Sequence, residues 1–314
     1  MSTVVAEGLE RKRDLIAISD LSADDVRRIL DLARGFQSVG RRAIKKVPAL
    51  RGRTVVLLFY EASTRTLSSF DLAAKRLSAD TVAFRAAGSS IEKGESLKDT
   101  VLTLTAYRPD AIVIRHPHAG AAAFIARYTD AAVINAGDGQ HQHPSQCLLD
   151  LLTIEGRLGT LEGKRIWIVG DVLHSRVARS NAQGFTLLGA HVTLAGPPSL
   201  IPREAETLGV DVRHDLSGMG EADVVYVLRM QQERQAPGQN FVPSLREYVT
   251  RYQVNHERLR PGQIVMHPGP VNRGVELSAA LCDDPRTLMT EQVEAGLVVR
   301  MAILYDLLAT PDGA

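Results

Sequence analysis

Residues 54–77, TVVLLFYEASTRTLSSFDLAAKRL, contain the pattern that decides the fold. The segment TVVLLFY at 54–60 is apolar throughout, as expected for a parallel strand that is buried on both faces. EASTRTLSSFDLAAKRL at 61–77 then has the pattern of a strand-to-helix turn followed by a helix. The stretch predicts the first β-α unit of an alternating α/β chain.

The alternation continues on both sides of this unit. Upstream, LSADDVRRILDLARGFQSV (21–39) predicts an amphipathic helix with Ser22 as its N-cap. The expected downstream strands are TVAFR (81–85), AIVIRH (111–116) and AAVINAG (131–137), with helices in SLKDTVLTLTAY (96–107) and AAAFIARYT (121–129). Polar residues such as Tyr60, Arg115 and Asn135 stand at the strand ends, where open α/β sheets bind ligands.

The second half of the chain repeats this organisation. A helix is expected from about Arg176 to Leu188, between the strand KRIWIVGD (164–171) and the further strands AHVTLAGP (190–197), ADVVYVLR (222–229) and QIVMHPGP (263–270). PSQCLLDLLTIEGRLG (144–159) should bridge the halves, and EQVEAGLVVRMAILYDLLA (291–309) should dock back on the first. We therefore predict an α/β fold with two Rossmann-like α/β domains that have parallel sheets and are linked by interdomain helices.

Composition limits the class of protein. The 314 residues suit two domains, and 37 basic against 36 acidic residues give no overall field that would attract nucleic acid or an anionic membrane. Cys147 and Cys282 show no metal-ligand spacing and suit a reducing compartment. The charged segment MSTVVAEGLERKRDLIAI is unlike a signal peptide, and no run reaches the length of a membrane span. We expect a cytoplasmic protein.

The turn Ser63-Thr64-Arg65-Thr66 is the strongest chemical signal. Backbone N–H groups, hydroxyls and a guanidinium converge there on the positive end of a helix dipole, as a phosphate dianion requires. Taken alone, the same letters would more often be a hydroxyl N-cap beside a surface arginine.

A second group of polar residues follows the strands of the first half. Arg115 ends one strand, and His143 and Gln146 stand at a helix start, where their N–H groups could stabilise a developing oxyanion. His141 and His143 also resemble a metal pair, but no Cys or acidic cluster accompanies them, and we reject zinc. Gly170-Asp171 lacks the glycine pattern of a dinucleotide site.

The second half supplies a further cationic group. Strands of this half are followed by Arg176, Arg229 and Gln231. A guanidinium group can bind a carboxylate through two parallel hydrogen bonds, so the two arginines indicate a site for carboxylates. Either arginine alone could be a solvated surface residue. The segment GSSIEKGE (88–95) is a small-residue loop with Lys93 near its tip; it could complete a neighbour's site or be a solvated surface loop.

These motifs together resemble the aspartate carbamoyltransferase family over nearly the whole chain. The segments that carry the resemblance, in order, are FYEASTRT, GSSIEKGES, IRHP, NAGDGQHQHPSQCLLD, GDVLHSRVARSN, LRMQQER, MHPGPVNRGVE and QVEAGLVVRMAIL. Departures are Leu67, where the family often has a basic residue, and Ser145, where it has Thr. The resemblance implies transfer of the carbamoyl group of carbamoyl phosphate to the amino group of L-aspartate, an early step of pyrimidine biosynthesis, without metal or cofactor.

The resemblance also implies roles for particular residues. The carbamoyl phosphate site would comprise Ser63, Thr64, Arg65, Thr66, Ser89, Arg115, His143, Gln146, Pro268 and Gly269, and the aspartate site Lys93, Arg176, Arg229 and Gln231. The catalytic residues would be Arg65, Thr66, Lys93, Arg115 and His143. Residues 1–145, completed by the helix at 291–314, would form the carbamoyl phosphate-binding domain, and residues 146–290 the aspartate-binding domain.

Family resemblance extends to assembly. Ser89 and Lys93 would come from the adjacent subunit of a homotrimer, a higher assembly with a dihydroorotase is compatible with the sequence, and a cis peptide is expected before Pro270. An ornithine-type carbamoyltransferase is the nearest alternative, but it carries H-C-L-P and S-M-G motifs where this chain has HPGP and LRMQQER. A non-catalytic scaffold is the alternative of another class.

Overall fold

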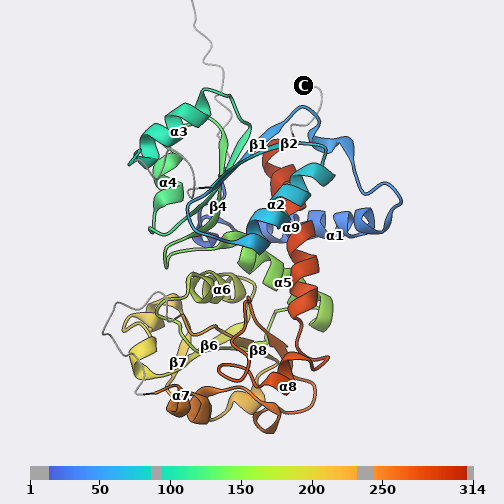
Figure 1. Cartoon of the computed structure of the whole chain (residues 1–314). Coiled ribbons are helices and arrows are strands. Elements are labelled where there is room, and N and C mark those ends of the chain that lie inside the picture. Colours follow the sequence, from blue (N-terminus) through green and yellow to red (C-terminus); the bar gives the residue numbers. More distant parts are fainter. Residues whose placement is uncertain (1–13, 86–93, 232–243, 310–314) are drawn as a thin grey trace, which may run out of the picture.

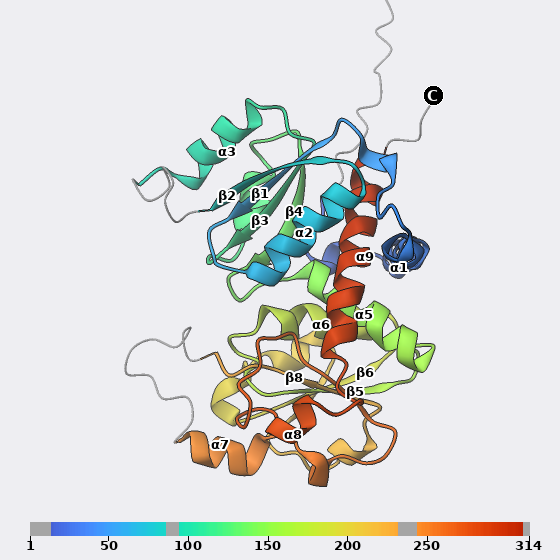
Figure 2. The same ribbon diagram turned by 45° about the vertical axis from the view of Figure 1, so that its right-hand side comes forward.

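The structure, a computed structural model, describes residues 14–85, 94–231 and 244–309. Within these residues the chain forms two α/β bodies, one above the other in Figures 1 and 2, each around its own sheet. Helix α5 (Pro144–Leu158) lies at their junction, and α9 (Met289–Leu308) runs alongside both.

The remaining helices surround the two sheets. They are α1 (Ala23–Phe36), α2 (Thr64–Arg76), α3 (Leu97–Thr105) and α4 (Ala121–Ile125) in the first body, and α6 (Arg176–Leu187), α7 (Leu245–Tyr252) and α8 (Ala279–Cys282) in the second. Ser22 caps α1 as predicted, because its hydroxyl accepts the backbone N–H of Asp25 at 3.1 Å.

The first sheet is parallel and has the strand order β2-β1-β3-β4. Its strands are β1 (Thr54–Phe59), β2 (Asp80–Arg85), β3 (Ala111–His116) and β4 (Ala132–Asp138). Val55 and Leu57 of β1 pack into the core formed with α1, α2 and α9. Val56 and Leu58 point to the other face and pack with α3 and α4. Both faces are covered, which explains why the strand is apolar at successive positions.

The second sheet is also parallel, in the order β7-β6-β5-β8-β9. Its strands are β5 (Arg165–Val169), β6 (His191–Ala195), β7 (Asp211–Arg213), β8 (Val224–Val227) and β9 (Ile264–Met266). The predicted α/β class with parallel sheets is confirmed. The short polar edge strand β7 and the helices α7 and α8 were not among the predicted elements.

Helix α9 returns the chain to the first body. It packs against α1, α2 and α5, as the sequence predicted for a docking helix. Its residues Val299, Ala302 and Ile303 are buried in the same core as β1. The first body is therefore built from both ends of the described chain, and the second body lies between them in sequence.

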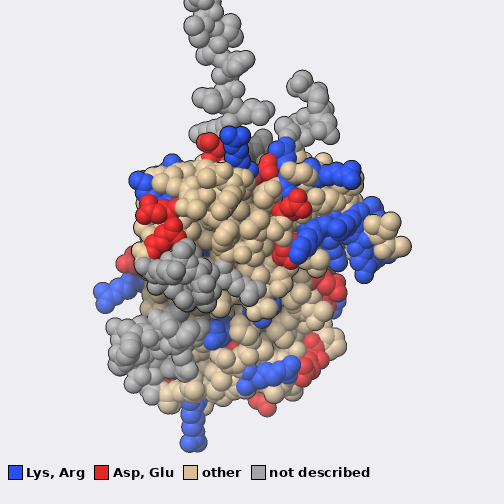
Figure 3. Space-filling model, turned by 45° about the horizontal axis from the view of Figure 1, so that its top comes forward, with Lys and Arg blue, Asp and Glu red and all other residues tan. Residues whose placement is uncertain are grey.

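The surface is mixed in charge. Figure 3 shows lysine and arginine side chains among acidic and other residues over the face drawn. Among the described residues, no helix has the combination of length and apolar character that crossing a membrane requires.

Candidate active site

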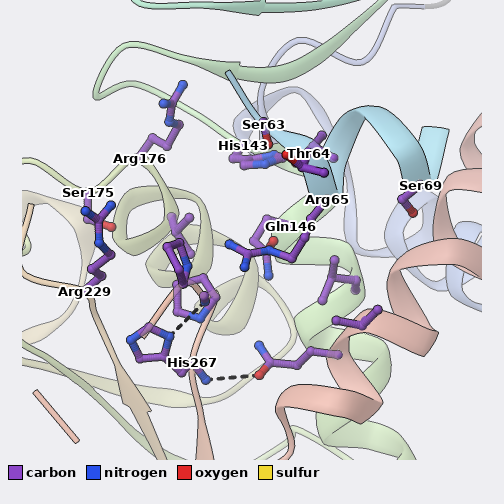
Figure 4. A pocket seen from close by; sticks show the side chains of 18 of the residues that line it. Ser63, Thr64, Arg65, Ser69, His143, Gln146, Ser175, Arg176, Arg229 and His267 are labelled. Carbon is purple, nitrogen blue, oxygen red and sulfur yellow. Dashed lines mark hydrogen bonds between the residues drawn. The ribbon is translucent and has the colours of Figure 1, made fainter. Parts of the chain in front are cut away.

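A cavity of about 610 Å³ lies where the two bodies meet. Much of its wall comes from residues at or just beyond the carboxyl ends of β1, β3, β5, β8 and β9, the edge at which parallel sheets bind ligands, and α5 and α9 supply the rest. Every predicted site residue that the structure describes lines it. These residues are Ser63, Thr64, Arg65, Thr66, Arg115, His143, Gln146, Arg176, Arg229, Gln231, Pro268 and Gly269. Figure 4 shows the labelled members of this set.

Two predicted residues are not placed by the structure. Ser89 and Lys93 lie outside the described residues, so their predicted contribution to a neighbouring subunit stays a prediction.

The turn between β1 and α2 presents the start of a helix to the cavity. Ser63 occupies the N-cap position of α2, yet in the described chain its side chain makes no cap hydrogen bond, unlike Ser22 of α1. The hydroxyl-cap interpretation of this turn therefore does not apply to Ser63. Partial burial lowers the pKa of Arg65, and the positive charge of Arg229 lowers it further. The helix start and Arg65 together favour an anion.

Arg115 and Arg176 meet at a single carboxylate. Nε of Arg115 lies 3.1 Å from Oε2 of Glu61, and Nη2 of Arg176 donates to the same oxygen. Gly137 makes this convergence sterically possible: a Cβ there would lie 2.9 Å from Nη1 of Arg176 and 3.3 Å from Nη1 of Arg115. The pair links the β1 edge of the first body to the start of α6 in the second.

The start of α5 supplies His143 and Gln146. His143 precedes the helix, is buried, and donates its backbone N–H to the hydroxyl of Ser180 on α6 at 2.8 Å. Gln146 lies in the first turn and donates its Nε2 to Oδ1 of Asp150 at 3.1 Å. The contact to α6 thus fixes the backbone of His143, and the contact along α5 holds the side chain of Gln146 at the cavity wall.

Residues after β8 form the wall opposite α2. Arg229 and Gln231 line the cavity, and Figure 4 shows that Arg65, Arg176 and Arg229 come from separate elements. The backbone N–H of Gln231 donates to Asp171 Oδ2 at 3.2 Å, and Asp171 Oδ1 lies 2.8 Å from Nδ1 of His174. Asp171, which we considered as part of a dinucleotide motif, is thus occupied in holding the loop after β8.

The turn after β9 closes the cavity against Arg65. The peptide bond between Gly269 and Pro270 is cis, as expected from the sequence. Gly269 has φ of +63°, and a Cβ there would lie 2.9 Å from Nη1 of Arg65, so the close approach requires glycine. The backbone N–H of Gly269 donates to Nδ1 of His267 at 2.9 Å. Because Nδ1 accepts this hydrogen bond, the proton of the His267 ring is on Nε2, which faces Glu276 Oε1 at 3.3 Å. Burial lowers the pKa of the ring.

Several lining residues were not identified from the sequence. They are Glu61, Ser69, Ser175, His267, Gln292 and Arg300, together with apolar neighbours. Glu61 directly precedes the phosphate-site motif, and Arg300 is a single charge inside an apolar helical run, so both had a sequence signal. Arg300 is buried and donates to the hydroxyl of Ser69 at 3.0 Å, and burial lowers its pKa to about 10.

A metal centre has no support in the described part of the chain. Within it, no group of three or more His, Cys, Asp and Glu side chains is placed to hold an ion. His141, one of the pair considered from the sequence, instead lies with Nδ1 3.1 Å from Oδ2 of Asp138.

Comparison with known proteins assigns both bodies to one family. Residues 13–156 match the carbamoyl-phosphate-binding domain of aspartate/ornithine carbamoyltransferases, and residues 162–307 match their Asp/Orn-binding domain. The chain is 55% identical over 297 residues to the aspartate carbamoyltransferase catalytic subunit of Pelotomaculum thermopropionicum, covering 93% of this chain and 96% of that one. The corresponding subunit of Moorella thermoacetica is 50% identical over 299 residues, with coverage of 94% and 97%.

Solved structures agree with this assignment. Aspartate transcarbamoylase from Trypanosoma cruzi, in complex with carbamoyl phosphate and aspartate, is 31% identical with a TM-score of 0.84, covering 95% of this chain and 97% of that one. Ornithine carbamoyltransferase from Pyrococcus furiosus also has a TM-score of 0.84, at 28% identity and with coverage of 96% and 98%. The chain therefore belongs to the aspartate/ornithine carbamoyltransferase family in both of its domains.

Proposed function

We infer that the chain is an aspartate carbamoyltransferase, which converts carbamoyl phosphate and L-aspartate into N-carbamoyl-L-aspartate and phosphate, a step of pyrimidine biosynthesis. The observation that carries this function is the convergence of four arginines from both bodies, Arg65, Arg115, Arg176 and Arg229, on one cavity. Carbamoyl phosphate is roughly a dianion and aspartate adds two carboxylates. Four guanidinium groups therefore nearly balance the charge of the two substrates.

The phosphate half of the site is proposed at the start of α2. Ser63, Thr64, Arg65 and Thr66 offer hydroxyls, a guanidinium and the free N–H groups of a helix start. The remaining members of the carbamoyl phosphate set surround this turn. They are Arg115, His143, Gln146, Pro268 and Gly269, with Ser89 expected from a neighbouring subunit.

The aspartate half is proposed on the opposite wall. The guanidinium groups of Arg176 and Arg229 can each bind one carboxylate of the amino acid through two hydrogen bonds, and the side-chain amide of Gln231 adds a further hydrogen-bonding group. Lys93 of a neighbouring subunit would add a cation. The proposed domain division follows: residues 1–145 with 291–314 bind carbamoyl phosphate, and residues 146–290 bind aspartate.

The chemistry needs positioning and charge stabilisation. The neutral amine of aspartate attacks the carbonyl carbon and forms the new C–N bond, while Thr66, Arg115 and His143 stabilise the oxyanion. The C–O bond to phosphate then breaks, and the leaving phosphate takes the proton released by the amine. The buried position of His143 keeps its ring out of bulk water at the reacting centre.

Acceptor choice is the test of this function. Purified protein and carbamoyl phosphate are incubated with L-aspartate or L-ornithine, and the carbamoyl amino acid and phosphate are measured. Turnover with aspartate alone is expected, because Arg176 and Arg229 repel a cationic side chain. Turnover with ornithine would contradict the assignment of these two arginines. If folded protein forms no carbamoyl amino acid with either acceptor, a non-catalytic scaffold would be favoured.

A homotrimer with shared sites is part of the proposal. Apolar side chains flank the segment that carries Ser89 and Lys93: Val82 on β2 is 42% exposed and Leu102 on α3 is 46% exposed. Such residues suit contact with a second copy of the chain. A further assembly with a dihydroorotase is compatible with this trimer. A cytoplasmic location is proposed because Cys147 and Cys282 are buried free thiols.

Mixed trimers test shared sites directly. Lys93→Ala and Arg65→Ala subunits should each be nearly inactive as pure trimers. If one site takes Arg65 from one subunit and Lys93 from its neighbour, random one-to-one mixing leaves both residues intact in roughly a quarter of sites. About that fraction of activity should return. If mass spectrometry shows that hybrid trimers form and the mixture has no carbamoyltransferase activity, shared sites would be contradicted.

A further inference from the structure

Asp150 is a buried carboxylate on α5 that receives four side-chain hydrogen bonds. Oδ1 accepts from Gln146 Nε2 at 3.1 Å and from Gln292 Nε2 at 2.7 Å. Oδ2 accepts from Asn181 Nδ2 at 2.9 Å and from the hydroxyl of Tyr226 at 2.7 Å. These four donors come from α5, α9, α6 and β8, so the carboxylate joins both bodies and the returning helix.

All four donors are neutral, which makes the burial of this carboxylate unfavourable. Burial raises the pKa of Asp150 to about 6, although the four hydrogen bonds act in the opposite direction. A neutral side chain would be easier to bury at this position. The negative charge of Asp150 acts on the nearby buried guanidinium of Arg300, and the carboxylate also offers an acceptor at each of its two oxygens.

An acceptor-only group fixes the direction of the amides beside it. An ionised carboxylate cannot donate, so Gln146 must turn Nε2 toward Asp150 and leave Oε1 as its other end. Gln292 is oriented in the same way, and its Oε1 accepts the backbone N–H of His267 at 3.1 Å. Both glutamines line the cavity, and Figure 4 shows Gln146 extending into it near Arg65.

We propose that Asp150 is a positioning residue, which orients Gln146 so that the cavity presents a carbonyl oxygen to the amino group of the carbamoyl substrate. The inference rests on the proposed function. The carbamoyl NH2 group is a hydrogen-bond donor, whereas the methyl group of acetyl phosphate has nearly the same shape and donates nothing. A site built around an acceptor discriminates between such groups. Asp150 thus sets the preference for a carbamoyl over an acetyl phosphate without touching either.

The same carboxylate also supports the turn after β9, which closes the cavity against Arg65. Oε1 of Gln292 accepts the backbone N–H of His267. Nδ1 of His267 in turn accepts the backbone N–H of Gly269, which lies beside Arg65. Asp150 therefore ties the direction of Gln146 to the position of the turn after β9.

Selectivity between the two acyl phosphates tests the proposal. We expect Asp150→Ala to lower the ratio of kcat/KM for carbamoyl phosphate to that for acetyl phosphate by roughly tenfold or more, because Gln146 loses the group that fixes its amide. Aspartate is the acceptor in both reactions, which yield N-carbamoyl- or N-acetyl-aspartate and phosphate. A purely structural Asp150 would lower both rates alike and leave the ratio unchanged.

Two variants serve as matched controls. Asp150→Asn keeps one oxygen in the place of Oδ1, so Gln146 and Gln292 retain their acceptor. The new NH2 group, in the place of Oδ2, can donate to the Tyr226 hydroxyl once that hydroxyl rotates. It can also donate to Asn181 if that amide turns, because Asn181 Oδ1 has no hydrogen-bond partner among the described residues. Tyr226→Phe removes a donor to Oδ2 and leaves the contact with Gln146. Both should keep the selectivity ratio within about threefold of the unmodified enzyme. A folded Asp150→Ala enzyme with that same ratio would overturn the proposal.

The orientation of Gln146 can also be seen without any variant. Neutron diffraction from crystals of the unmodified enzyme distinguishes the deuterated nitrogen from the oxygen of an amide. Oε1 of Gln146 should face the cavity, and Nε2 there would overturn the proposal even if Asp150→Ala does not fold. Turnover of carbamoyl phosphate with aspartate by the unmodified enzyme tests the function separately.

Discussion

Arg176, the first residue of α6, donates across the domain junction to the carboxylate of Glu61, just beyond β1. The side chain of Arg176 is only 4% exposed, and Arg115 shares the same carboxylate oxygen. One acidic side chain thus holds two arginines of the proposed site. A substrate carboxylate that binds Arg176 must replace part of this contact or bind beside it.

Glu61→Gln should therefore reduce activity without removing any proposed substrate ligand. An amide keeps one acceptor but loses the charge that holds Arg115 and Arg176 together. Loss of a charge-assisted hydrogen bond at a partly exposed group predicts a fall in kcat/KM of about tenfold. Steady-state kinetics with varied aspartate measure it, and unchanged kinetics would mean that the ion pair does not position the arginines. Glu155→Gln, which removes a carboxylate paired with Arg34 away from the cavity, is the control.

Arg65→Ala should lower kcat by about 100-fold or more, because it removes a cation from the proposed phosphate position. Circular dichroism should show an unchanged fold, since the side chain lines a cavity and is not part of a core. Arg51→Ala, at an exposed position, is the control and should keep full activity. A near-normal kcat in the Arg65 variant would remove this residue from the site.

Alanine variants of Gly269 and Gly262 distinguish the effect of backbone strain from the effect of a side-chain contact with Arg65. Gly269 has φ of +63° and a Cβ there would meet Arg65 at 2.9 Å, whereas Gly262 has φ of +86° and no heavy atom within 4 Å of the added Cβ. Both Gly→Ala variants should lose about 1 kcal/mol of unfolding free energy, from the left-handed backbone. Only Gly269→Ala should also lose activity, by tenfold or more, through displacement of Arg65. Equal activities in the two variants would show that the contact with Arg65 is unimportant.

The titration of Asp150 predicts a pH dependence of stability. Its pKa is about 6 in the folded protein against an ordinary value of 3.8. Between these values the folded protein retains a proton that the unfolded chain has released, so stability falls as pH rises from about 4 to about 6 and then levels off. The difference corresponds to roughly 3 kcal/mol. Urea denaturation at pH 4.5 and 7 should show this fall in the unmodified protein and a smaller one in Asp150→Asn. Parallel pH profiles would show that another group is responsible.

The fold was predictable because its signals are local. The apolar run at 54–59 and the capping serine at Ser22 each require only a few neighbouring residues, and both behave as expected in the structure. The edge strand β7 was not predicted, because Asp211–Arg213 is short and polar and has no periodic apolar pattern. Strand order was also beyond the sequence, since it depends on pairing between segments far apart in the chain.

The cavity was predictable only in part, for a related reason. Motifs at strand ends identified residues that line it, such as Arg65 and Arg229. The partner relationships were hidden, because Glu61 and Arg176 are 115 positions apart and Asp150 and Gln292 are 142 apart. Sequence spacing on one helix or turn can indicate a ligand set, whereas the groups that orient those ligands come from other elements and emerge only when the chain is folded.

The position of α9 has a consequence for synthesis. This helix fills the core of the first body against α1 and α2, yet it is translated after every residue of the second body. The amino-terminal half that emerges first from a ribosome therefore exposes the apolar surface that α9 later covers. Completion of that core must wait for the rest of the chain, and a nascent polypeptide stalled before Met289 would be a client for chaperones rather than a folded domain.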